Sequence, residues 1–225
     1  MIEPAGAQGL TPVAQDYLKV IWSAQEWSDR PVTTTALAAR LGVGTSTVSE
    51  TVRRLAEAGL VVHEPYGAVG LTVPGRTHAL AMVRRHRLLE TFLVAQLGYA
   101  WDEVHDEAEV LEHAVSDRFV ERIAALLGHP VRDPHGDPIP GPDGAVTVPP
   151  AGPLWRAPEG DWRVARISDA DPDLLRYLAS VGLVLDARVS VRHRRPAGVV
   201  TVAFADGSHV DLAEPAACAI YVSAP

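Results

Sequence analysis

The spacing of apolar and polar residues predicts a winged helix-turn-helix at the start of the chain. Between residues 11 and 27 apolar side chains recur at helical spacing, after a Thr-Pro pair that suits a helix start. Residues 33–60 predict a short helix of small residues, a glycine turn and a second amphipathic helix. Two β-forming runs separated by Pro-Tyr-Gly follow in residues 60–73. This order predicts a DNA-binding domain over residues 1–75, with a small α/β domain that does not bind DNA as the alternative.

The pattern then changes to two long helices, expected over residues 76–98 and 103–127. The second helix has an apolar face that we expect to lie in the core: Val104, Ala108, Leu111, Val115 and Phe119. Two helices with wide apolar faces beside a DNA-binding domain predict a dimerisation domain, placed at residues 76–141. Helix-turn-helix proteins usually bind two half-sites about 34 Å apart, so we expect a homodimer on palindromic double-stranded operator DNA.

The remaining chain predicts a linker and a small β domain. Residues 128–160 are rich in proline and glycine, which favours an extended linker, and the domain boundaries assign residues 142–160 to it. Turn-forming residues surround His135, so a turn residue is favoured there over a metal ligand. In residues 161–225, five short strand patterns and one helix predict a small SH3-like barrel. The expected fold class is therefore mainly α with small β parts.

Composition narrows the class of protein. The chain has 225 residues and a formal net charge of −8, which argues against indiscriminate nucleic-acid binding. Its single cysteine, Cys218, excludes an internal disulfide and favours a reducing compartment. The N-terminus lacks the basic start and apolar run of a signal peptide, and no apolar run reaches the roughly 18 residues that span a bilayer. We therefore expect a cytoplasmic protein without a membrane partner.

Candidate metal ligands lie in the acidic part of the chain, residues 99–141, where ten acidic residues accompany three arginines. If residues 105–113 are helical, four side chains that can bind metal share one stripe: His105, Glu109, Glu112 and His113. A second pair, one helical turn apart, lies on the preceding helix: His86 and Glu90. Histidine and carboxylate without cysteine form a ligand set for a divalent ion such as Mn(II) or Fe(II). The alternative is a solvated face with weak ion pairs.

The second helix of the helix-turn-helix carries the expected DNA-reading side chains. It begins with three hydroxyl residues, which can contact phosphates and base edges, and its arginines can reach the DNA backbone. Tyr66 lies in the turn of the expected hairpin. The full set expected to contact DNA is Arg40, Thr45, Ser46, Thr47, Ser49, Glu50, Arg53 and Tyr66.

Four motifs make the chain similar to a known family. They are Asp16-Tyr17-Leu18, Arg85-His86-Arg87-Leu88-Leu89-Glu90, His105-Asp106-Glu107-Ala108-Glu109-x-x-Glu112-His113 and Gly136-Asp137-Pro138-Ile139-Pro140-Gly141. With the order of the domains, they resemble the diphtheria-toxin-repressor family of metal-dependent regulators over essentially the whole chain. The iron-sensing branch of that family has methionine at the position of Asp16 and cysteine at that of Glu109. Carboxylates at both positions make this chain similar to the manganese-sensing, MntR-type branch, since oxygen ligands suit Mn(II).

The resemblance implies two metal sites in each subunit. The primary set would be Asp16, Glu109, Glu112 and His113, and the ancillary set would be His86, Glu90 and His105. Family members with the barrel, which is of the FeoA type, add two polar side chains from it, and here Asp169 and Asp171 lie nearest to that pattern. One departure is Lys19, where compact manganese regulators without the barrel have a metal-binding glutamate. Two separated sites are therefore expected rather than a tight two-metal cluster.

The function implied is a manganese-dependent DNA-binding transcriptional regulator that represses manganese-uptake genes when Mn(II) is plentiful. Mn(II) is the expected ion, at two per subunit, while Fe(II), Co(II) or Zn(II) can bind in vitro. No organic cofactor and no catalytic residue are expected. Three alternatives stay open: an iron-dependent repressor of the same fold, a metal-dependent hydrolase, and a winged-helix regulator of small organic ligands. A hydrolase site would leave a coordination position for water beside a substrate cleft.

Overall fold

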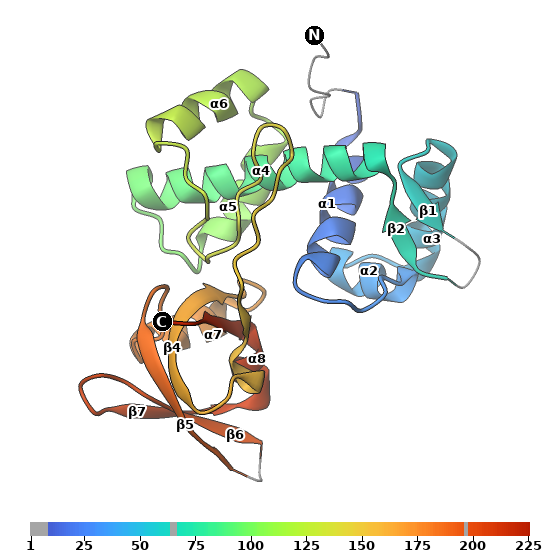
Figure 1. Cartoon of the computed structure of the whole chain (residues 1–225). Coiled ribbons are helices and arrows are strands. Elements are labelled where there is room, and N and C mark those ends of the chain that lie inside the picture. The colour runs from blue at the N-terminus through green and yellow to red at the C-terminus, as the bar shows by residue number, and fades with distance from the viewer. Residues whose placement is uncertain (1–8, 64–66, 196–197) are drawn as a thin grey trace. The chain divides into compact units, whose positions relative to one another are not determined.

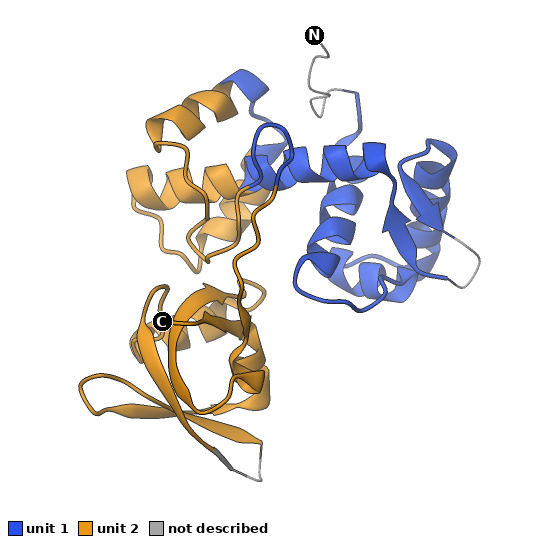
Figure 2. Cartoon of the chain, in the orientation of Figure 1, with its two compact units in different colours: residues 1–86, 112–118, 140–145 blue, residues 87–111, 119–139, 146–225 orange. Residues whose placement is uncertain are grey.

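The computed structural model describes residues 9–63, 67–195 and 198–225 (Figure 1). Its contacts divide the chain into two compact units (Figure 2). The first unit comprises residues 1–86, 112–118 and 140–145, and the second comprises residues 87–111, 119–139 and 146–225. Three helices therefore contribute residues to both units. Tyr66, which the sequence places at the DNA, lies outside the described residues.

The first unit begins with a winged helix-turn-helix. Its elements are α1 (Pro12–Glu26), α2 (Thr34–Leu41), α3 (Thr45–Glu57), β1 (Val61–His63) and β2 (Val69–Leu71). The Thr11 hydroxyl caps α1 by accepting from Ala14 N at 3.3 Å, and Thr33 caps α2 in the same way. Gly42 has φ 65° after α2, a left-handed conformation that permits the tight turn toward α3.

One hydrophobic core holds these elements together. Its fully buried members are Leu18, Ile21, Leu37, Val48, Val52 and Val69. The strands β1 and β2 pair antiparallel, and Val69 N donates to Val32 O at 2.8 Å, which joins the wing to the segment before α2. The expected winged helix-turn-helix is confirmed.

Three helices follow the wing: α4 (Val73–Leu97), α5 (Val104–Glu112) and α6 (Asp117–Leu126). The expectation of one helix over residues 103–127 is wrong, because the helix ends at Glu112 and a new one begins at Asp117. At this break Arg85 Nη1 donates to Glu112 O at 2.9 Å, and the same guanidinium pairs with Asp117. Arg85 thus satisfies a carbonyl that the helix end leaves without a helical partner. Phe119, expected in the core, is 46% exposed beyond the break.

Part of the expected linker is instead a buried loop of the second unit. The side chains of Asp133, His135, Asp137 and Ile139 are all buried. Ile167 N donates to His135 O at 2.9 Å, so the loop is bonded to the C-terminal sheet. Gly136 has φ 94°, and a Cβ there would lie 2.2 Å from Ala165 O, so the close approach requires glycine. An extended linker is therefore wrong for residues 131–139.

The rest of the second unit is a six-stranded antiparallel sheet in the order β3-β8-β4-β5-β6-β7, with its helices packed against it. Its elements are β3 (Gly152–Pro153), η1 (Leu154–Arg156), β4 (Gly160–Ile167), α7 (Pro172–Ser180), β5 (Arg188–Arg195), β6 (Val199–Ala203), β7 (His209–Ala213), α8 (Glu214–Ala219) and β8 (Ile220–Ser223). The expected SH3-like domain is confirmed, although no pairing of β7 with β3 closes the sheet among the described residues. Among the described residues of the whole chain, no helix is both long enough and apolar enough to cross a membrane.

Candidate metal centres and DNA-reading helix

Three of the four expected primary ligands meet in the first unit. Asp16 lies on α1, Glu112 ends α5, and His113 follows it. His113 Nε2 is 2.8 Å from Asp16 Oδ1 and 3.6 Å from Glu112 Oε1. One donor atom from each of the three lies within 4.8 Å of the other two. Two carboxylates and an imidazole at this spacing can bind one hard or borderline divalent ion.

Gln15 sets the direction of the His113 imidazole. His113 Nδ1 lies 2.9 Å from Gln15 Oε1, and an amide oxygen can only accept, so Nδ1 carries the hydrogen. This leaves Nε2 to face Asp16 and Glu112. Proteins orient metal-binding imidazoles in this way, with the remote ring nitrogen donating to a protein oxygen. The sequence analysis missed Gln15, and its place beside Asp16 on α1 was the signal that could have identified it.

Glu112 is completely buried, and each of its carboxylate oxygens has a side-chain partner. Lys19 Nζ lies 2.5 Å from its Oε1, and His86 Nδ1 lies 2.6 Å from its Oε2. Burial raises the pKa of Glu112, but the His86 hydrogen bond and the charges of His86 and Lys19 outweigh it, so the pKa is lowered overall. Burial raises the pKa of Asp16 despite the opposing charge of His113. Lys19 therefore already provides a positive charge beside the buried Glu112 carboxylate.

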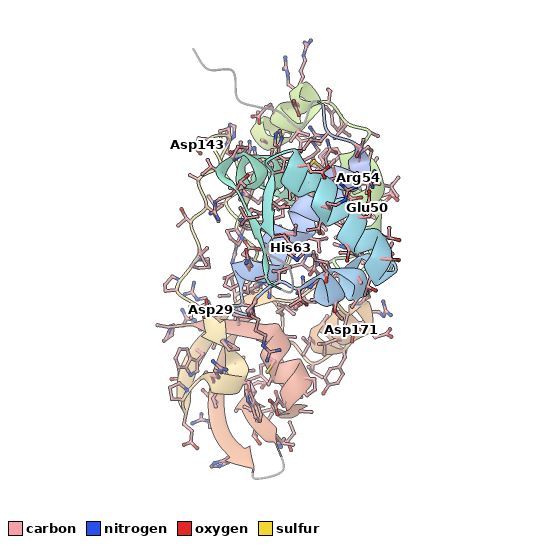
Figure 3. The ribbon with its side chains drawn as sticks, turned by 90° about the vertical axis from the view of Figure 1, so that its right-hand side faces the viewer. Asp29, Glu50, Arg54, His63, Asp143 and Asp171 are labelled. Carbon is pink, nitrogen blue, oxygen red and sulfur yellow. The ribbon has the colours of Figure 1, made fainter. Side chains whose placement is uncertain are left out.

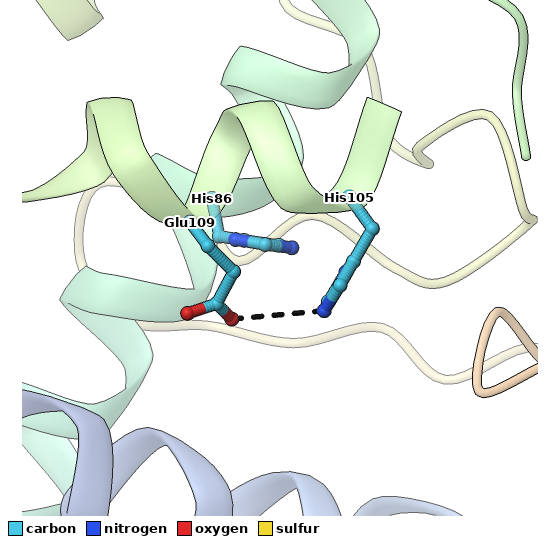
Figure 4. Close-up of side chains that lie close together, drawn as sticks. All are labelled: His86, His105 and Glu109. Atoms are coloured by element: carbon cyan, nitrogen blue, oxygen red, sulfur yellow. Dashed lines mark ion pairs between the residues drawn. The ribbon is translucent and has the colours of Figure 1, made fainter. Parts of the chain in front are cut away.

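The fourth expected primary ligand, Glu109, belongs to the second unit. It lies on α5 one turn after His105, whose Nε2 is 3.7 Å from Glu109 Oε1 (Figure 4). His86, also drawn in Figure 4, lies on α4 and belongs to the first unit. The place of Glu109 in the primary set and that of His86 in the ancillary set therefore stay predictions.

The second unit brings together the other two expected ancillary ligands and one of the candidates from the C-terminal domain. His105 Nδ1 is 3.3 Å from Glu90 Oε1 and 3.4 Å from Asp169 Oδ2. Burial lowers the pKa of His105, but hydrogen bonds to Asp169 and Glu90 outweigh it and raise the pKa to about 10. The pKa of Asp169 is lowered, because its own burial is outweighed by the His105 hydrogen bond. An imidazolium thus offsets part of the negative charge of these two carboxylates.

Asp171, the other candidate from the C-terminal domain, has a different role. Its Oδ1 accepts from Asp173 N at 3.0 Å and from Leu174 N at 3.1 Å, which makes it the N-cap of α7. Asp171 is exposed, and it belongs to none of the groups of possible metal ligands among the described residues.

The buried loop contributes a histidine that the sequence analysis assigned to a turn. The turn is present, because Asp133 Oδ1 accepts from the backbone N of both His135 and Asp137 at 2.9 Å. However, the His135 side chain is completely buried, and it forms a group of possible metal ligands with Glu90 and Asp169. No sequence motif links His135 to the other candidate ligands, because only the tertiary fold brings its loop to α4.

The arginines of this region are engaged by carboxylates of the same loop. Arg166 Nε donates to Asp137 Oδ1 at 2.6 Å, and Arg87 Nε lies 3.5 Å from Asp133 Oδ2. Burial and the neighbouring charge of Asp137 raise the pKa of Asp133 well above its ordinary value. These contacts hold the loop in place beside Glu90.

The helices α2 and α3 expose the side chains expected to read DNA, with Arg40 on α2 and the others on α3. Those described and exposed are Arg40, Thr45, Ser46, Thr47, Ser49, Glu50 and Arg53. Glu50 and Arg54 lie on the outer side of α3 (Figure 3), and Arg53 Nη2 pairs with Glu50 at 2.7 Å. Ser49 Oγ donates to Thr45 O at 2.9 Å. Gly44, at the N-cap, provides no side-chain cap, so the first backbone N–H groups of α3 can donate to a phosphate oxygen.

Three family models match successive parts of the chain. "Iron dependent repressor, N-terminal DNA binding domain" matches residues 9–69, and "Iron dependent repressor, metal binding and dimerisation domain" matches residues 72–141. The FeoA domain model matches residues 153–224. Together these models span the winged helix-turn-helix, the helices and the C-terminal sheet.

Individual proteins are similar over nearly the full length. The iron-dependent repressor IdeR of Mycobacterium leprae (strain TN) is 32% identical over 226 residues, covering 95% of this chain and 97% of its own. Among solved structures, a manganese-dependent transcriptional repressor in complex with manganese has 64% identity and a TM-score of 0.91, covering 94% of this chain and all of its own. ScaR with bound Cd²⁺ has 35% identity and a TM-score of 0.81, covering 93% and 98%.

Proposed function

Because the chain belongs to the diphtheria-toxin-repressor family of metal-dependent transcriptional repressors, we propose that its activating metal is Mn(II) and that it represses manganese-uptake genes when Mn(II) is plentiful. The proposal places a homodimer on palindromic operator DNA in the cytoplasm, without catalytic activity. The matched DNA-binding and dimerisation domains support the DNA and the dimer. Two ions would bind per subunit, one at the primary set of ligands and one at the ancillary set.

The chemistry of the primary cluster carries the choice of metal. Asp16, Glu112 and His113 offer only oxygen and nitrogen donors. Such donors suit Mn(II), whereas thiolate and thioether ligands favour softer ions. The similarity to a manganese-dependent repressor at 64% identity supports the same choice.

Asp16 couples the metal site to the DNA-binding core. It lies on α1, whose Leu18 and Ile21 are completely buried in the core that supports α3. When bound, an Mn(II) ion supplies positive charge between the Asp16 and Glu112 carboxylates, which otherwise repel each other. Asp16 would then hold α1 against the end of α5 and restrict where α3 can lie. A coupling of about 1–3 kcal/mol corresponds to roughly 5–150-fold in operator affinity, and operator DNA must tighten metal binding equally.

Operator binding with and without metal tests this proposal. A duplex selected from random sequences by the Mn(II)-loaded protein serves as the probe in a fluorescence anisotropy titration. We expect wild type and Asp29→Ala, an exposed aspartate of the same unit, to bind at least about 5-fold more tightly with Mn(II) than with chelator. Asp16→Ala should lose this difference. Equal affinity of chelated and loaded wild type would refute the proposal.

An iron-dependent repressor is the second candidate, because IdeR of Mycobacterium leprae shares 32% identity over 97% of its length. Titrations of operator binding at matched free Mn(II), Fe(II), Co(II) and Zn(II) separate the two. Tight Zn(II) binding alone does not decide, because most such sites favour zinc over Mn(II) and Fe(II). We expect the double variant Asp16→Met with Glu109→Cys to shift the response from Mn(II) toward Fe(II) and Co(II). Activation of wild type by Fe(II) at a lower free concentration than Mn(II) would favour the iron candidate.

A further inference from the structure

The helix α3 carries a carboxylate in the half that is expected to face the bases of DNA. A recognition helix places its N-terminal residues against the base edges in the major groove. Glu50 lies in the first half of α3, and 53% of its side chain is exposed. Val48 and Val52 of the same helix are completely buried, so Glu50 lies on the outer face (Figure 3).

The charge of Glu50 is unfavourable near DNA unless the carboxylate gains a specific contact. Duplex DNA carries one negative charge for about every 1.7 Å of its length, and like charges across an interface repel each other. The hydrogen bond from Arg53 lowers the pKa of Glu50, so this side chain is ionised at neutral pH. An ionised carboxylate only accepts hydrogen bonds, so its partner must be a donor on a base and not a phosphate.

The arginine beside Glu50 is engaged by carboxylates at each of its guanidinium nitrogens. Arg53 Nε donates to Glu50 Oε2 at 3.2 Å, and Nη2 donates to Glu50 Oε1 at 2.7 Å. Arg53 Nη1 pairs with Glu57. The two bonds to Glu50 hold the plane of its carboxylate, so that little freedom is lost when a base binds. Arg53 is therefore better placed to orient Glu50 than to bind a phosphate.

Glu50 keeps the capacity to accept from a base. A carboxylate has about four lone-pair sites, and Arg53 takes one on each oxygen. In the major groove cytosine offers its N4 amino group as a donor, whereas guanine and thymine present acceptors. Adenine has a donor as well, but its N7 acceptor lies next to it and repels a carboxylate. Cytosine is thus the base that suits Glu50.

We propose that Glu50 accepts a hydrogen bond from the N4 amino group of a cytosine in each operator half-site, with Arg53 as the positioning residue. The inference rests on the proposed operator binding and adds the base that this side chain selects. Glu50 then lowers the affinity for DNA in general and raises the preference for one sequence. Removing its carboxylate should relax that preference.

The test uses the Mn(II)-loaded full chain and the duplex that it selects from random sequences. Each C·G pair is replaced by T·A in both half-sites, and binding is measured by fluorescence anisotropy. We expect one pair at which the change weakens wild type by at least about 5-fold and Glu50→Ala by less than about 2-fold. Glu57→Ala, which removes the other carboxylate bound to Arg53, is the matched control and should keep the wild-type preference.

The variant Arg53→Ala separates positioning from simple charge. We expect it to lose the preference for cytosine at the pair that depends on Glu50. An arginine that only attracts phosphates would instead weaken binding about equally for all sequences, and that result would contradict its positioning role.

A base analogue tests the contact with the wild-type protein. N4-methylcytosine still pairs with guanine, but a methyl group replaces the N4 hydrogen that faces the groove. We expect this base to weaken wild type by at least about 5-fold and to leave Glu50→Ala unaffected. The inference is overturned if Glu50→Ala discriminates at every C·G pair as wild type does, if the methyl group affects both proteins equally, or if the dependence on Glu50 falls at an A·T pair. Failure of the proposed function is distinct, because it appears as equal affinity of chelated and loaded wild type for the selected duplex.

Discussion

We expect Lys19 to compete with the metal for Glu112, and the variant Lys19→Met tests this expectation. Its Nζ lies 2.5 Å from Glu112 Oε1, with 8% of the Lys19 side chain and none of the Glu112 side chain exposed. Methionine has a similar length and no charge. Lys19→Met therefore removes the ammonium while it keeps most of the apolar contact of the side chain.

The structure sets the size of the expected effect. Removing one partner of a buried ion pair costs about 3–5 kcal/mol, because the remaining charge is left uncompensated. His86 Nδ1 still lies 2.6 Å from the other Glu112 oxygen, so we expect the low end, about 3 kcal/mol, in the metal-free protein. A bound Mn(II) ion would neutralise Glu112 in place of Lys19. If about half of the loss is recovered in this way, Mn(II) binds roughly tenfold more tightly to the variant than to wild type.

Two measurements test the expected loss of stability and the expected gain in Mn(II) affinity. Urea unfolding of the chelated protein gives the change in the free energy of unfolding, and isothermal titration with Mn(II) gives the affinity of the primary site. Arg30→Met, which removes an exposed cation from the same unit, controls for net charge and should change both by little. The reasoning is refuted if Lys19→Met leaves the metal-free stability unchanged, or if it weakens Mn(II) binding.

Two further predictions concern the second unit. His105 has its pKa raised to about 10, so its stabilising charge is fully present below the unfolded-state value near 6.5 and is lost as the pH rises toward 10. Urea unfolding of metal-free protein between pH 6 and 10 should show this decline, and His105→Gln should flatten it. Asp171→Ala should cost about 1 kcal/mol, because it removes the cap of α7, and should leave Mn(II) binding unchanged. Asp169→Ala should instead abolish binding of the second ion, so equal Mn(II) affinities in these two variants would contradict the assignment.

Local signals in the sequence were sufficient for most helices and strands. The Thr11-Pro12 pair starts α1, and Gly42 ends α2, because capping and left-handed turns depend on a few neighbouring residues. The strands of the C-terminal sheet follow from alternating apolar positions for the same reason. The candidate ligands on one helix, His105 and Glu109, could also be paired from their spacing of one turn.

Where a helix or a loop depends on residues that are distant in the sequence, its limits could not be predicted. Residues 113–116 carry no strong helix breaker, and the break there is stabilised by Arg85, which reaches the Glu112 carbonyl from α4. The proline-rich residues 131–139 resemble a linker in composition. They are buried because Asp133 and Asp137 bond to arginines on other elements.

The sequence alone determined the winged helix-turn-helix and the C-terminal β domain and predicted which residue types would bind the metal, since these follow from chemistry and local periodicity. Only the tertiary structure decided that Lys19 and His86 hold Glu112, that Asp169 faces His105, and that His135 is buried beside Glu90. The physical reason is that a ligand site is formed by side chains far apart along the chain. Their distances depend on how the segments pack, which no local pattern of residues encodes.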